Sequence, residues 1–376
     1  MEKAGEKSAG LGLIELLDKD LQVSMLSAAL KRDRLGGTLL FFGPEAAGKS
    51  SLAFWLAAAL NCERSAGWGP ACTECNSCHK VAGLIHPDVL WVFPVPGNFY
   101  SGAQVDEGKL AKVFDQKRTQ PWSEIQFAEK AEHHLASITR VRSEASRSAY
   151  EGRRKVFIIT GAERLRLEAA NAFLKLLEEP RPGVTLILCS DRPASLLPTI
   201  LSRCQRLHLT RPRISTLAAL LQERFSIPAP VAGELLTAAD GNLAAALQMK
   251  AEGAYQAQKE WVDKTLEAVN QGSDTRLLDL CDDRSGPMYN RGDFERYLAL
   301  LTRRLEEVLL AKLSRREGKE GPGGDYALRV ADSRALIKFM GRLVNQHDSL
   351  NRNVNLRLLG WSLLSEMREV IGGTAG

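Results

Sequence analysis

One short segment constrains the fold of this chain more than any other, a loop of the form G-x-x-x-x-G-K-[ST] between an apolar run and a helical run. The loop spans residues 43–50, the apolar run 38–42 precedes it, and the helix-like segment 52–60 follows it. Where a strand meets a helix N-terminus, the backbone N–H groups of such a loop can cradle phosphate oxygens. This context favours a true phosphate-binding loop over a chance match in a glycine-bearing turn.

The loop predicts a nucleotide site for ATP and Mg²⁺. We expect Lys49 to reach the outer phosphates and Ser50 to hold the magnesium ion. The candidate nucleotide-binding residues are Gly43, Pro44, Glu45, Ala46, Ala47, Gly48, Lys49, Ser50 and Ser51.

A cluster of four cysteines starts twelve residues after the loop. The cysteines follow the spacing C-x9-C-x2-C-x2-C and are Cys62, Cys72, Cys75 and Cys78. Thiolates two residues apart on a tight turn can bind one tetrahedral ion, so we predict a closed, structural Zn²⁺ site. Four free thiols in a reducing compartment are the alternative. The remaining cysteines stand singly, which argues against a redox or iron–sulfur role: Cys189, Cys204 and Cys281.

Composition narrows the class of protein. The 376 residues are 44% hydrophobic and 25% charged, which is typical of a globular chain with two or three domains. No apolar run approaches the roughly 20 residues of a membrane span, and residues 1–10 lack the apolar core of a signal peptide. We therefore expect a cytoplasmic protein with no membrane partner, whose cysteines are reduced or bind metal.

Charge alone does not identify a nucleic-acid partner, because the formal net charge is only +5. Basic residues do concentrate between residues 140 and 155. A solvated helix face is the alternative to DNA binding for this segment. The candidate DNA-binding residues are Arg140, Arg142 and Arg147.

Apolar runs alternate with helical segments as far as residue 209. We expect strands at 38–42, 89–93, 155–160, 184–189 and 205–209. We expect helices at 52–60, 123–150, 168–179 and 196–203, and a turn-rich excursion at 94–120 with a short helix at 108–117. Such alternation predicts an α/β fold with a parallel sheet covered on both faces.

From residue 210 onward the pattern is helical, with no convincing strand. Short helices are expected at 214–225, 230–239 and 243–252, and further helical periodicity appears at 293–316 and 332–345, around a glycine-rich stretch at 317–324. We predict three domains: 1–209 with the cysteine module at 62–78, a small helical domain at 210–255, and an all-helical domain at 256–376.

Five features in order along the chain resemble bacterial clamp-loader subunits of DNA polymerase III, the gamma/tau and delta-prime group of AAA+ proteins. The cysteine module after the P-loop helix is similar to that family's zinc module, and His86-Pro87-Asp88 follows it. Residues 171–180 resemble the family's N-A-L-L-K-x-L-E-E-P, residues 202–204 its S-R-C, and residues 353–355 its N-V-N. The resemblance implies an AAA+ nucleotide-binding domain, a helical lid at 210–255 and a helical collar at 256–376.

Two departures from the family indicate which member this is. In hydrolysing subunits, the strand that corresponds to residues 155–159 is followed by Asp-Glu. This chain has Thr160 and Gly161 at those positions, and the nearest acidic residue after them is Glu163. The lid motif G-S-L-R appears as residues 241–244, which end in Ala244 instead of arginine. The resemblance thus implies a delta-prime-type stator without its own ATPase activity, whose P-loop either binds nucleotide structurally or is a relic.

The resemblance also implies partners: gamma/tau and delta subunits, the sliding clamp, and primer-template DNA within the complex. Arg203 of the S-R-C motif is implied to act in trans as an arginine finger on a neighbour's ATP. Its alternative is a local ion pair with Glu178 or Glu179. The segment 95–134 is longer than the family's link, either as a surface excursion or as a partner-binding element.

Two other functions compete with this interpretation. An active gamma/tau-type ATPase would need acidic residues at the end of strand 155–160, where none is found. A zinc-containing, nucleic-acid-binding regulator would use the basic segment and bind DNA without partners. For the region after residue 255, an isolated bundle is the alternative to a collar that joins subunits.

Overall fold

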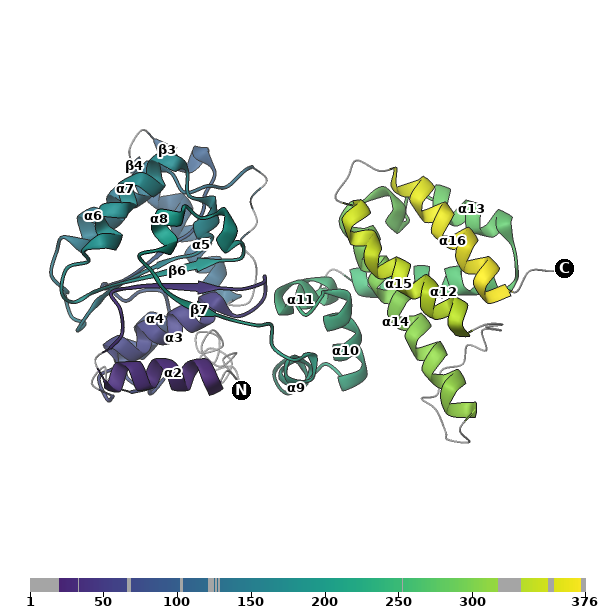
Figure 1. Ribbon diagram of the computed structural model, residues 1–376, viewed down its shortest axis with the longest axis horizontal. Helices are drawn as coiled ribbons and strands as arrows, with labels where there is room; N and C mark the ends of the chain where they lie inside the picture. The colour runs from purple at the N-terminus through teal and green to yellow at the C-terminus, as the bar shows by residue number, and fades with distance from the viewer. Residues whose placement is uncertain are drawn as a thin grey trace. The chain divides into compact units, whose positions relative to one another are not determined.

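The computed structural model describes residues 20–32, 34–65, 69–101, 104–120, 125, 127, 129–251, 253–316, 333–350 and 355–372 (Figure 1). The chain divides into two compact units, Met1–Arg213 and Ile214–Gly376. Sequence predictions for residues 1–10, 317–324 and 353–354 lie outside the described residues. No described helix is long and apolar enough to cross a membrane.

The first unit contains a five-stranded parallel sheet with strand order β2-β5-β6-β1-β7. The strands are β1 Thr38–Phe42, β2 Val89–Val92, β5 Lys155–Ile159, β6 Val184–Ser190 and β7 Gln205–His208. Strands β5 and β6 are buried at every position, as expected for central parallel strands. The predicted parallel sheet is confirmed.

Helices cover both faces of this sheet. Side chains alternate along each strand, so neighbouring residues of one strand belong to two different cores. Phe41, Ile158 and Ile187 belong to the core under one face, whereas Leu40 and Phe157 belong to the core under the other. Figure 1 shows α3 and α4 on the first side and α6 and α7 on the second. The helices of this unit are α2 Asp20–Lys31, α3 Lys49–Asn61, α4 Asn76–Ala82, α5 Glu107–Thr119, α6 Leu135–Ala145, α7 Leu167–Glu178 and α8 Pro198–Leu201.

The excursion after β2 is an organised part of the first unit. It contains the hairpin strands β3 Tyr100–Ser101 and β4 Gln104–Val105, then α5, close to the predicted short helix. The prediction of a helix over 123–150 is wrong at both ends, since α6 spans only Leu135–Ala145. Backbone pairing explains its late start, because Glu132 pairs with Val95 and His133 with Leu165. The helix predicted at 196–203 is also shorter than expected.

Every regular element among the described residues of the second unit is a helix. Its helices are α9 Ile214–Phe225, α10 Ala229–Ala238, α11 Leu243–Ala251, α12 Ala254–Asn270, α13 Asp274–Asp282, α14 Arg291–Arg316, α15 Ser333–Leu350 and α16 Leu356–Gly372. Of these, the sequence did not single out α12, α13 and α16. Arg303 of α14 donates to Thr237 of α10 at 3.0 Å, so side chains from both sides of residue 255 interact. The division into lid and collar domains stays a prediction.

Candidate nucleotide and metal sites

The phosphate-binding loop connects β1 to α3 and needs glycine at both of its ends. Gly43 has φ 150°, and a Cβ there would lie 2.0 Å from the carbonyl oxygen of Leu209. Gly48 has φ 79° and is the N-cap of α3. Gly43 therefore has no room for a side chain, and Gly48 has a left-handed backbone that strains any other residue. The predicted strand, loop and helix arrangement around residues 43–51 is present.

Lys49, the first residue of α3, points back into the loop and is buried. Its ammonium nitrogen Nζ donates to the carbonyl oxygens of Gly43 at 3.0 Å and Pro44 at 2.5 Å. The same nitrogen forms an ion pair with Asp191 Oδ1 at 2.6 Å.

The sequence analysis did not identify Asp191 as a site residue. It directly follows β6, the neighbour of β1 in the sheet, and the carboxyl ends of parallel strands meet at one edge. An acidic residue just after an apolar strand was the only signal for it. Nothing in the spacing connected it to Lys49.

The two residues that follow β5, Thr160 and Gly161, are held by contacts with neighbouring segments. Thr160 Oγ1 accepts a hydrogen bond from Trp91 Nε1 at 3.1 Å, and its carbonyl oxygen accepts one from His133 Nε2 at 2.8 Å. Burial lowers the pKa of His133 to about 4, which keeps this imidazole neutral. Gly161 has φ 64°, and a Cβ there would lie 2.7 Å from Pro94 Cγ. A glutamate at position 161 would therefore meet both strain and a clash.

Glu163 lies two residues farther on, in the 3₁₀ turn Ala162–Arg164. Its Oε2 is buried, and no described group donates a hydrogen bond to it. Burial raises the pKa of Cys189 to about 12, and the charges of Lys49, Asp191 and Glu163 also act on that thiol. These three charged residues thus share one neighbourhood near the carboxyl end of β6.

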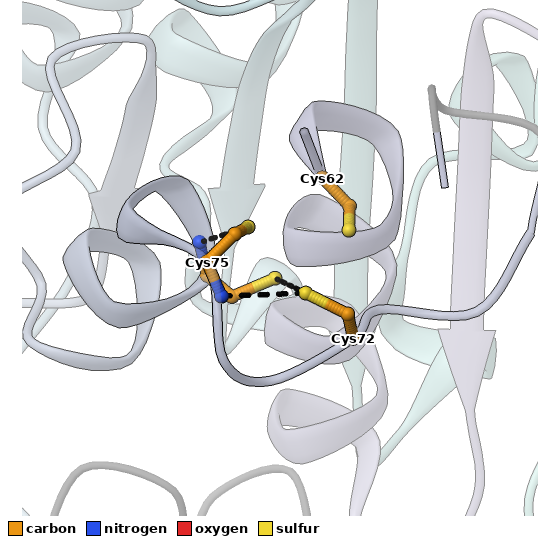
Figure 2. Close-up of side chains that lie close together, drawn as sticks. Cys62, Cys72 and Cys75 are labelled. Carbon is orange, nitrogen blue, oxygen red and sulfur yellow. Dashed lines mark hydrogen bonds between the residues drawn. The ribbon is translucent and has the colours of Figure 1, made fainter. Parts of the chain in front are cut away.

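The four cysteines of the predicted module come together in space. Cys62 caps the end of α3, Cys72 lies in the following loop, Cys75 caps α4, and Cys78 lies within α4. Their Sγ atoms are all within 4.8 Å of one another, and those of Cys72 and Cys78 are 4.0 Å apart. Figure 2 shows Cys62, Cys72 and Cys75 converging from separate segments. A tetrahedral zinc site with Zn–S bonds of about 2.3 Å has S–S edges of about 3.8 Å, so the residues present could hold a metal.

Hydrogen bonds to sulfur favour the thiolate form in part of this module. Burial opposes ionisation of Cys62, but hydrogen bonds to its sulfur, among them one from the backbone N–H of Ser65 at 3.4 Å, outweigh it and lower the pKa to about 6. At Cys75 burial is likewise outweighed, chiefly by the backbone N–H of Cys78, so its pKa is lowered. Burial raises the pKa of Cys78. Hydrogen bonds thus favour the thiolate, which is the form that binds metal, at two of the four sulfur atoms.

The His-Pro-Asp motif holds a turn in place. Asp88 accepts backbone hydrogen bonds from Tyr150 at 2.7 Å, Glu151 at 2.9 Å and Gly152 at 2.7 Å. Burial opposes ionisation of Asp88, but these three donors outweigh it and lower its pKa. Asn61, which the sequence analysis missed, similarly accepts from the backbone N–H of Arg153 at 2.9 Å. Both side chains are structural anchors.

Two of the three predicted DNA-binding arginines form ion pairs. Arg140 pairs with Glu107 at 3.2 Å, and Arg147 pairs with Glu144 at 2.9 Å. Arg142 is exposed on α6. Contact between these residues and DNA stays a prediction.

Arg203 lies just after α8 and is tied to α7. Its Nη2 pairs with Glu178 Oε1 at 2.5 Å, and its Nη1 donates to the carbonyl oxygen of Thr199 at 3.0 Å. The side chain remains 34% exposed. The local ion pair considered as an alternative is therefore present, and the action of Arg203 in trans stays a prediction.

The two remaining motifs form helix ends. Asn242 Oδ1 accepts from the backbone N–H of Ala244 at 3.0 Å and caps α11. Asn355 Oδ1 accepts from the backbone N–H of Arg357 at 3.1 Å at the start of α16, as expected for an amide that fixes a helix end. Ala244 contributes no charge at the position where the family's lid motif has arginine.

Together, the fold and the loop define a P-loop α/β protein that carries a four-thiol module. Residues 19–213 match a family model described as DNA polymerase III, delta subunit, and this match covers more than half of the chain. The chain belongs to that family. The resemblance to clamp-loader subunits of delta-prime type is thereby confirmed.

Individual relatives agree with the family match. A protein of Pseudomonas aeruginosa named DNA polymerase III subunit delta' is 30% identical over 62% of this chain and 61% of its own length. The protein of that name from Bacillus subtilis is 26% identical over 66% of this chain and 64% of its own length. A tau/gamma subunit of Haemophilus influenzae is 26% identical over 77% of this chain and 40% of its own. The chain thus aligns with less than two thirds of the length of these relatives.

Proposed function

We propose that this chain is the delta-prime-type subunit of a clamp loader that places a sliding clamp on primer-template DNA, and that it does not hydrolyse ATP itself. Its partners would be gamma/tau and delta subunits. Family membership and the names of the relatives support the assembly. The stator role rests on one observation at the end of β5. Thr160 accepts a hydrogen bond from Trp91, and Gly161 packs against Pro94, so neither position offers a carboxylate.

Hydrolysis requires a base that orients and activates water in line with the leaving phosphate. Thr160 and Gly161 offer no carboxylate, and the backbone at Gly161 has no room for one. Ala244 adds no charge toward a nucleotide. The loop at 43–51 can bind phosphate in such a subunit, but turnover would depend on neighbouring subunits.

Arg203 is the residue through which this chain would act on a neighbour. A guanidinium stays charged and can donate two hydrogen bonds to phosphate oxygens as negative charge shifts in the transition state. The pair with Glu178 is exposed, so exchange of that carboxylate for a neighbour's phosphate costs little. The Cys62, Cys72, Cys75 and Cys78 module would bind one Zn²⁺ and stabilise the fold at the end of α3.

One observation favours the active ATPase as a second candidate. Glu163 has a buried carboxylate oxygen without a described donor, in the neighbourhood of Lys49. If Glu163 replaced the missing glutamate, the isolated chain would release phosphate from ATP, and Glu163→Gln would abolish that release.

Two measurements separate these candidates. Co-purification of the full chain from its native cell should recover gamma/tau and delta subunits, and their absence at physiological salt would contradict the assembly role. Phosphate release by the purified chain should stay at background. Release that disappears with both Lys49→Ala and Glu163→Gln would instead identify an active ATPase, whereas tight DNA binding by the chain alone would favour the zinc-containing regulator.

A further inference from the structure

The Lys49 ammonium has all of its hydrogen bonds in use. An ammonium group carries three N–H donors. Three acceptors surround Nζ: the carbonyl oxygens of Gly43 and Pro44, and Oδ1 of Asp191. A phosphate oxygen that binds Lys49 must therefore displace one of them.

Asp191 is the acceptor that a phosphate would replace. The two carbonyl oxygens belong to the loop itself, so they remain beside Nζ whenever the loop keeps its shape. Asp191 comes from a different strand end and supplies a negative charge at 2.6 Å, a close, charge-assisted contact. Its carboxylate therefore occupies the one Lys49 N–H that a phosphate oxygen could take over.

The two partners differ in how freely they can move. The Lys49 side chain is only 8% exposed, whereas the Asp191 side chain is 39% exposed. Asp191 can turn toward solvent without carrying a charge through the interior. If it stays, its carboxylate repels an incoming polyphosphate.

We propose that Asp191 is an internal competitor for phosphate at this P-loop. Polyphosphate binds only after the Asp191 carboxylate leaves Lys49, so the loop keeps a complete phosphate-binding sequence but has weakened affinity. The inference rests on the proposed phosphate-binding role of residues 43–51. It explains how an intact P-loop can persist in a subunit that does not use ATP for turnover.

The test measures binding of a fluorescent ATP analogue with Mg²⁺ to the full-length purified chain, followed by its displacement with inorganic tripolyphosphate. Asp191→Asn keeps the size of the side chain but removes its charge. We expect it to tighten binding of both compounds at least tenfold, because the competition concerns phosphate and not the base. In the Asp191→Asn background, Lys49→Met should abolish binding, which locates the effect at the loop.

Asp115→Asn is the matched control. Asp115 pairs with Arg118 at 2.6 Å on the surface of α5, so the variant also removes one negative charge and one ion pair from the first unit. Its affinity for both compounds should stay within twofold of the unmodified chain.

Asp191→Ser provides an independent variant, and thermal unfolding checks that each protein is folded. Unchanged or weaker binding by both Asp191 variants would overturn the inference. So would a complete lack of binding by the unmodified chain and by both variants, because a cause other than Asp191 would then limit the loop. Neither result bears on the clamp-loader role, which co-purification tests separately.

Discussion

At the scale of single residues, Gly161 is central to the proposal that this chain does not hydrolyse ATP. We expect Gly161→Glu to leave phosphate release at background and to destabilise the protein. The left-handed φ of 64° costs a non-glycine residue roughly 1–2 kcal/mol, and the contact with Pro94 raises the total to about 3 kcal/mol. Urea unfolding and a phosphate-release assay measure the two outcomes.

Gly183→Glu is the control for this variant. Gly183 has φ 82°, but nothing lies within 4 Å of the Cβ that a side chain would add. It should therefore show only the backbone cost of roughly 1–2 kcal/mol. Equal stability of the two variants would mean that Pro94 yields, and ATP turnover by Gly161→Glu would mean that the site needs only the missing carboxylate.

Asp88 makes the stability of the first unit depend on pH. Its pKa is lowered from the ordinary value of 3.8, because three backbone donors outweigh burial. A lowered pKa in the folded state contributes stability above the unfolded pKa, and this contribution disappears as pH falls through the folded pKa. Asp88→Asn should cost about 2 kcal/mol at neutral pH, because an amide cannot accept from all three donors.

The pH dependence itself is the check on this assignment. Urea unfolding of Asp88→Asn and the unmodified chain should show a difference that shrinks as pH falls below about 4. Asp115→Asn, at an exposed surface pair, should differ little at any pH. A constant difference across the range would assign the loss to packing and not to the carboxylate charge.

At the scale of elements, the excursion after β2 packs its helix against the sheet edge. Phe114 of α5 lies 5.9 Å from Trp91 and 6.0 Å from Phe93, measured between ring centroids. Arg118 donates to the carbonyl oxygen of Gly83 at 2.8 Å, which joins α5 to the end of α4. A free surface excursion would have neither contact, so the described part of this segment stabilises the unit.

Phe114→Ala should lower the free energy of unfolding by about 3 kcal/mol, the usual cost of truncating a packed phenylalanine. Phe114→Leu should cost less than half as much, because most of the apolar contact remains. Urea unfolding gives both values. An unchanged midpoint in Phe114→Ala would show that the excursion is not part of the folded core.

The four-cysteine module gives a prediction about metal. The purified chain should contain one Zn²⁺, and Cys72→Ser should reduce the metal content and lower the unfolding temperature. Cys281→Ser is the control, since Cys281 is a single buried thiol on α13, outside the module. Metal analysis after purification without chelator decides the matter. Far less than one zinc per unmodified chain, or an equal loss of zinc in Cys72→Ser and Cys281→Ser, would count against the site.

What the sequence could predict depended on whether the signal was local. The strands β1, β5 and β6 lie close to their predicted places, because an apolar run is a local property. The cysteines came together because ligand spacing is local too. Asp191 depends on β6 lying beside β1, and the start of α6 depends on Glu132 pairing with Val95. Contacts between distant residues leave no periodic trace in a single sequence.

At the scale of the whole molecule, the proposed role depends on what Arg203 does inside a ring of subunits. In the chain alone it pairs with Glu178 at the surface, where an ion pair contributes about 0–1 kcal/mol. Arg203→Ala should therefore leave folding, zinc content and assembly intact. Any large effect should appear only in the complex, where a phosphate could replace the Glu178 carboxylate.

In a reconstituted clamp loader, Arg203→Ala should slow DNA-stimulated ATP turnover and clamp loading. An arginine supplied in trans can be worth ~10³-fold or more at the site it completes, but this chain would complete one of several sites, so total turnover should fall only in part. Arg206→Ala is the matched control, because Arg206 is an exposed arginine on the neighbouring strand β7. Normal loading by the Arg203→Ala complex would show that the Glu178 pair is the whole role of this arginine. Equal slowing by both variants would point to a general loss of positive charge at that edge.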